Sequence, residues 1–226
     1  MYRLLTTFFS FLIFQPLFAQ EYVDMSSSNS GTFELQSNIK GEALAPVGSP
    51  FLNENWESGT IDLADGKIME IEQMNFNSHK GVICYKKNNV VYNSSKDLDV
   101  TKFNIGNQLF LSHTVDGEKI YLQVLVQGDK MKLLKQSFTD FIPGTPSKGY
   151  VGAEPPKYVA KANFYVQPDG ENPRLIKAKK KEILKVLSDK EDEIKDFIST
   201  NSLNIKEERG LMQVFDYYNL ISGDKG

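Results

Sequence analysis

Residues 60–142 form short runs of strand-forming residues, separated at short and fairly even intervals by turn residues. This spacing is typical of an antiparallel sheet that folds into a sandwich or a partly open barrel. The expected strands are 60–64, 67–76, 81–85, 89–92, 102–105, 108–114, 119–126 and 130–138. We therefore expect an antiparallel β-domain that covers residues 39–142 and organises the rest of the chain.

Three short turns indicate how these strands are connected. Asp65-Gly66 and Asp116-Gly117 are two-residue hairpin turns, because this pair tolerates the positive φ angles that such turns need. Gly128-Asp129 is a third candidate. Tight hairpins join antiparallel neighbours, so they predict an up-and-down meander rather than a parallel sheet.

The strand expected at 67–76 contains a slip in its alternation. Met69 and Ile71 fall on one face of the strand, whereas Met74 and Phe76 fall on the other. A β-bulge between the two pairs would return both to the interior.

The chain changes character after the β-domain. Prolines and glycines between 143 and 157 exclude a central strand and predict an extended linker. Residues 164–166 are then expected to pair with 174–176 as a hairpin. Residues 158–221 are thus expected to form one segment, which begins with this hairpin and docks on the β-domain.

Three short amphipathic helices are expected after this hairpin. Each has one apolar stripe, and Ser188 with Glu191 resembles a capping box at the start of the second helix. The predicted fold class is therefore α+β, with a meander followed by a hairpin and three helices. The stripes are Ile183, Leu184 and Leu187, then Ile194, Phe197 and Ile198, then Leu211, Val214, Phe215 and Tyr218.

Residues 1–19 read as a signal peptide, with Arg3, an apolar run of limited length, and Ala19 at the expected cleavage site. The run is shorter than the ~20 apolar residues of a membrane-spanning helix, although an uncleaved anchor is the alternative. Residues 20–38 are expected to be a flexible leader and 222–226 a disordered tail. No lipid-attachment cysteine stands directly after the run, so we expect a periplasmic or surface-exposed protein that is not a lipoprotein.

Few residues suggest catalysis. The single cysteine, Cys84, lies in an apolar strand and is expected to be buried. His79 and His113 fall near strand ends, where they could bind a metal with Asp116 or Asp62, but turn positions are the simpler interpretation.

Glu70 and Glu72 share one face of a strand, which is more typical of a solvated face than of a glycosidase pair. No phosphate loop or nucleophile motif is present. We therefore expect no enzymatic activity and no catalytic, cofactor-binding or metal-binding residue.

Two places are candidates for contacts. Gly48-Ser49-Pro50 precedes Phe51 and Trp56, which we expect in a loop that plugs one end of the sheet, with a binding site at Trp56 as the alternative. The second is a basic cluster that could hold lipid phosphates or form a solvated face balanced by acidic residues downstream. Its candidate contact residues are Lys177, Lys179, Lys180 and Lys181.

Both places carry a resemblance. The element at 48–54, followed by the strand start Gly59-Thr60, resembles the opening of uncharacterised exported proteins of the Bacteroidetes lineage. In those proteins the element is GSPYLN followed by an acidic residue. This chain has Phe51 at the position of the tyrosine. The lysine-rich helical end from Leu175 to Asn201 is similar to the end of the same proteins. That group has no established activity, so the resemblance implies only an envelope or secreted location in a Gram-negative bacterium.

We expect the protein to be a non-catalytic binding or accessory component of the cell envelope. Its expected partner is an envelope protein or glycan, and anionic lipid head groups at the lysines are the alternative. The net charge of −3 gives no reason to expect nucleic acid as a partner. The alternatives are a carrier of small apolar ligands with a barrel-like cavity and, with less support, a hydrolase acting on polysaccharide or peptide.

Overall fold

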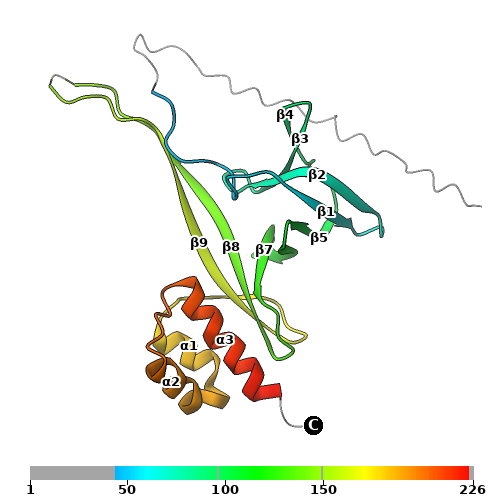
Figure 1. The fold of residues 1–226 in the computed structure, drawn as a ribbon, viewed down its shortest axis with the longest axis vertical. Coiled ribbons are helices and arrows are strands. Elements are labelled where there is room, and N and C mark those ends of the chain that lie inside the picture. Colours follow the sequence, from blue (N-terminus) through cyan, green and yellow to red (C-terminus); the bar gives the residue numbers. More distant parts are fainter. Residues whose placement is uncertain (1–43, 96, 149, 224–226) are drawn as a thin grey trace, which may run out of the picture.

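The computed structural model describes residues 44–95, 97–148 and 150–223, so the predicted signal peptide, leader and last residues of the tail lie outside it. One ten-stranded antiparallel sheet and three α-helices make up the fold, which is α+β (Figure 1). The strands are β1 (Glu57–Leu63), β2 (Ile68–Asn77), β3 (Val82–Lys87), β4 (Val90–Asn93), β5 (Val100–Ile105), β6 (Gln108–Val115), β7 (Glu118–Val126), β8 (Met131–Ile142), β9 (Lys157–Pro168) and β10 (Arg174–Ile176).

The sheet is a meander with one rearrangement. Its strand order is β10-β9-β8-β7-β6-β5-β1-β2-β3-β4, so β1 lies between β5 and β2, and β10 and β4 are the two edges. The sheet therefore does not close into a barrel. All eight strands expected between residues 60 and 138 are present, and Asp116 and Gly117 have φ angles of 50° and 82°, as a tight hairpin turn requires.

The bulge expected in the second strand is confirmed. Ile71 lies opposite Gly59, but Met74 lies opposite Glu57, so β2 has one residue more than β1 across this interval. The shift turns Met74 and Phe76 into the core that Ile71 also contacts. Aromatic rings fill this core, and the rings of Phe103 and Phe110 stack with centroids 4.6 Å apart.

Strands β8 and β9 form a long hairpin that extends past the rest of the sheet (Figure 1). They pair over twelve positions, from Met131 opposite Pro168 to Ile142 opposite Lys157, whereas β7 pairs with β8 only as far as Lys135. We call residues 136–148 and 150–163 the arm. The segment 143–157 was interpreted from its prolines as a linker. Its described residues connect β8 to β9, with bridges between Thr145 and Glu154 and between Lys148 and Val151, and Lys157 is the first residue of β9.

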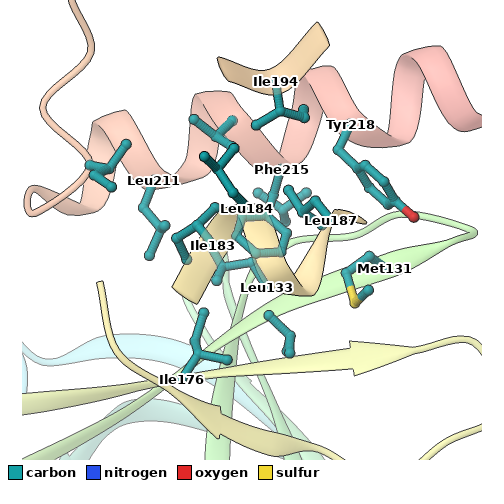
Figure 2. Close-up of a cluster of buried hydrophobic side chains, with 14 of the residues drawn as sticks. Met131, Leu133, Ile176, Ile183, Leu184, Leu187, Ile194, Leu211, Phe215 and Tyr218 are labelled. Carbon is teal, nitrogen blue, oxygen red and sulfur yellow. The ribbon is translucent and has the colours of Figure 1, made fainter. Parts of the chain in front are cut away.

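The helices α1 (Lys180–Val186), α2 (Glu191–Thr200) and α3 (Glu208–Gly223) lie against the other end of β8 and β9 (Figure 1). Their three predicted apolar stripes, apart from Phe197, meet in one core with strand residues such as Leu133 and Ile176 (Figure 2). Phe197 is only partly buried, and its ring stacks on that of Tyr217 with centroids 4.0 Å apart. The predicted pairing of 164–166 with 174–176 is also present, as β9 with β10. Hydrophobic burial therefore joins the helices to the sheet.

One close contact of α3 requires a glycine. Gly210 is buried, and a Cβ there would lie 2.3 Å from the carbonyl oxygen of Asn204, so only glycine permits this close approach.

The capping box expected at Ser188 is wrong. Ser188 begins a 3₁₀ turn (Ser188–Lys190), Glu191 is the first residue of α2, and no side chain caps that helix.

Candidate functional site

Residues 44–53, which we call the strap, connect the arm to strand β2. Val47 accepts a hydrogen bond from the backbone of Tyr158 in β9, and its own N–H donates to Pro156, with N···O distances of 2.8 and 2.9 Å. Five residues later, the backbone of Leu52 donates to Phe76 in β2. The strap thus connects two strands that are far apart in the order of the sheet.

Gly48 is the residue at which the strap leaves β9. Its φ angle is +84°, and a Cβ at this position would lie 2.6 Å from the carbonyl oxygen of Tyr158. A side chain is therefore excluded both by backbone conformation and by space. This accounts for the glycine of the Gly-Ser-Pro element without any role in binding.

A second connection joins the turn after β2 to the arm. The hydroxyls of Ser78 and Thr139 lie 2.7 Å apart, and the backbone N–H of Thr139 donates to the carbonyl of Ser78. Ser78 also donates to the carbonyl of Pro50 in the strap, at 3.1 Å. Ser78 and Thr139 are both buried, so these bonds form without competition from water. We call this group of contacts the junction.

His79 completes the junction. Its Nδ1 lies 2.9 Å from the carbonyl oxygen of Thr139, which can only accept, so Nδ1 carries the proton. Its ring contacts the rings of Phe141 and Tyr158, with centroids 6.3 and 5.6 Å away. His79 thus fixes the base of the arm.

Exposed apolar side chains are concentrated on the arm and the strap. In the described part of the chain, these two segments carry half of the exposed large apolar residues, and Ile142 at the end of β8 is 50 % exposed. The others are dispersed over the rest of the surface. Those on the two segments are Leu44, Val47, Phe141, Ile142, Tyr150 and Val151.

The predicted plug residues lie at the end of the strap. Phe51 packs edge-on against Trp56 with ring centroids 5.2 Å apart, and the Nζ of Lys86 sits 4.7 Å above the Trp56 ring. Leu52 contacts the aromatic core of the sheet, whereas the Phe51 and Trp56 side chains are only partly buried. The two aromatic residues are therefore brought together, as part of the connection between strap and sheet.

The basic cluster lies elsewhere, between the end of β10 and the first turn of α1, and β10 is the opposite edge of the sheet from β4. Lys177, Lys179, Lys180 and Lys181 are all exposed, and none of them forms an ion pair with another described residue. The structure therefore does not combine the lysines with Phe51 and Trp56 in one site.

The residues considered for catalysis have other surroundings. Cys84 is buried with its Sγ 3.1 Å from the side-chain oxygen of Asn93, and burial raises the pKa of the thiol to about 11. The imidazole of His113 is half-buried, and burial followed by the charge of Lys132 lowers its pKa. Glu70 and Glu72 are exposed on β2.

Among residues 44–95, 97–148 and 150–223, no three His, Cys, Asp or Glu side chains gather in a way that could hold a metal ion. None of the helices in the same ranges has the length and apolar character that a bilayer crossing requires. No family model, curated protein or solved structure matches this chain. The arguments about function therefore depend on the surfaces just described.

No pattern in the sequence pointed directly to Thr139 and Tyr158, which belong to the junction. Their contacts are to backbone groups and to residues far away in the chain, so no local pattern marks them. The adjacent Phe141 and Ile142, directly before Pro143, were the available signal, because neighbouring strand residues point to opposite faces and one of two adjacent apolar side chains then faces away from the core.

Proposed function

We propose that this protein is an exported, envelope-associated binding or accessory component without catalytic activity, and that the arm is its contact surface for another envelope protein. The observation that supports this proposal is the concentration of exposed apolar side chains on the arm and strap. Contiguous exposed apolar surface is typical of interaction sites.

The junction supports the same proposal. Phe141 and Ile142 lie at the end of β8, next to the part of the arm that is held by buried hydrogen bonds to Ser78 and by the ring of His79. A partner therefore meets side chains that are already positioned, and binding requires less ordering of the arm. Phe141 and Ile142 are 39 % and 50 % exposed, so covering them adds roughly half of the about 1.5–3 kcal/mol that burial of a fully exposed side chain is worth.

Photocrosslinking in the native envelope tests the arm. A photoreactive phenylalanine analogue at position 141 should give a discrete crosslinked species, and the same analogue at Ile68 should not. Ile68 is a matched control because it is 66 % exposed but lies on β2, away from the arm. Replacement of Ile142 by serine should reduce the yield from position 141. Equal yields from the two positions would refute the arm as the contact surface.

The alternatives have less support. A carrier of small apolar ligands would require a closed sheet around a cavity, whereas β4 and β10 leave this sheet open at both edges. A hydrolase would require convergent carboxylates, and Glu70 and Glu72 lie on an exposed face of β2. Anionic lipid at the lysine cluster remains as an additional contact within the proposed function.

A further inference from the structure

Positive charge is concentrated in one short stretch of this acidic protein. Between Arg174 and Leu187 there are six basic residues and one acidic residue, Glu182, whereas the whole chain carries a net charge of −3. All six basic side chains are exposed. We call Arg174, Lys177, Lys179, Lys180, Lys181 and Lys185 the basic surface.

Two of the acidic residues that follow this stretch, Glu193 and Asp189, have other partners. Glu193 pairs with Lys190 at 3.5 Å, and Asp189 accepts hydrogen bonds from the hydroxyl of Tyr218. Within the described part of the chain, none of the six side chains of the basic surface takes part in an ion pair. Two of them, Lys180 and Lys181, also lie in the first turn of α1, where the helix dipole disfavours positive charge.

The exposed leucine of β10 does not belong to the basic surface. Leu175 is 58 % exposed, although its neighbour Ile176 is buried in the core beneath the helices. Because side chains alternate along a strand, Leu175 lies on the opposite face of the sheet from Ile176 and the helices, whereas Arg174 shares the face of Ile176. Recognition of a partner by the basic surface therefore depends on its charge.

We propose that the basic surface docks on an anionic phospholipid bilayer, with its lysines at the head-group phosphates. Charge complementarity supports this partner, because a bilayer presents many phosphates side by side and the six exposed basic side chains lie close together in the chain, between Arg174 and Lys185. This inference rests on the proposed envelope location, but it uses a surface at the other end of β8 and β9 from the arm (Figure 1). The protein would thus contact the membrane and its protein partner with different ends.

Sedimentation with vesicles tests the inference on the full chain as it is exported. Wild-type protein should sediment with vesicles of equimolar phosphatidylglycerol and phosphatidylcholine, should stay in solution with phosphatidylcholine alone, and should be released by high salt. Substitution of Lys179, Lys180 and Lys181 by glutamine should weaken partitioning on the order of a hundredfold.

The matched control removes three positive charges elsewhere. Lys67, Lys80 and Lys102, changed together to glutamine, lie on or beside β2 and β5, towards the opposite edge of the sheet from β10. This variant should sediment like the wild type. Equal sedimentation of both triple variants would overturn the inference, as would binding to neutral vesicles. Saturable binding of inorganic phosphate without sedimentation would overturn it too.

The two proposals fail separately. Serine at both Phe141 and Ile142 should abolish the crosslink to the protein partner and leave vesicle sedimentation unchanged. Loss of vesicle binding in the lysine variant, with crosslinking retained in detergent-solubilised envelopes, would support the basic surface independently of the arm. Absence of any crosslink with normal sedimentation would refute the arm alone.

Discussion

The hydroxyl pair at the junction allows a sharp prediction about stability. Ser78 has one hydroxyl proton, and the carbonyl of Pro50, at 3.1 Å, can only accept it. The contact of 2.7 Å between the two hydroxyls must then be donated by Thr139 to the oxygen of Ser78. The two side chains therefore form an ordered chain from Thr139 through Ser78 to Pro50.

Valine at position 139 keeps the shape of threonine but removes this donor. Because both side chains are buried, loss of the bond should lower the free energy of unfolding by about 1–1.5 kcal/mol. Alanine at position 78 removes both bonds of the chain and leaves the Thr139 hydroxyl without an acceptor, so it should cost about 2–3 kcal/mol. In this alanine background, Thr139→Val replaces an unpaired hydroxyl by a methyl group and should cost about zero.

Urea unfolding of the wild type, both single variants and the double variant measures this difference as a double-mutant cycle. The backbone bond between Thr139 and Ser78 remains in all four proteins, so the m-value should be unchanged. A cost of Thr139→Val that is the same in both backgrounds would refute the hydrogen-bonded chain.

Three further predictions concern other buried groups. Asn219 bonds both the N–H and the carbonyl of Met131, at 3.0 and 2.8 Å, so Asn219→Ala should cost about 2–3 kcal/mol in urea unfolding; a cost near zero would show that α3 docks without it. Burial lowers the pKa of His113 from 6.5, so the unfolded state binds more protons than the folded state, and the free energy of unfolding should fall as pH drops below that value. His113→Gln should flatten the pH profile of unfolding. An unchanged profile would contradict the burial argument. A pKa of about 11 instead of 9.0 leaves about a hundredfold less thiolate on Cys84. A maleimide should therefore label the folded chain at least a hundredfold more slowly than the urea-unfolded chain. Comparable labelling rates would contradict the burial of Cys84.

The parts of the fold that could be predicted from the sequence are those set by local patterns. Alternation placed the strands, and the slip between Ile71 and Met74 was sufficient to locate a bulge, because each face of a strand must remain either apolar or polar. Helical periodicity likewise selected Ile183, Leu187 and the other core residues before any tertiary contact was known. These signals lie within a few residues of the features they predict.

The features that sequence missed depend on distant partners. The prolines at 143–157 were interpreted as a linker because proline interrupts a ladder, but β8 and β9 pair on both sides of that segment through residues with ordinary strand propensity. Ser188 had the spacing of a capping box, yet its turn tightens into a 3₁₀ helix and the cap is not formed. Of the candidate site, Phe51, Trp56 and the lysines could be named from sequence, whereas Thr139 and Tyr158 could not, because their contacts come from the folded arm.

The strap also determines when this protein can finish folding. Val47 pairs with the start of β9, more than one hundred residues later in the chain. Because synthesis proceeds from the N-terminus, the strap emerges early and must wait until the whole meander and the arm have followed. Pairings this distant form late and slowly, since a long loop must close first. Until then, Val47 and the apolar end of the arm stay open together, and during this interval the protein is most exposed to wrong partners.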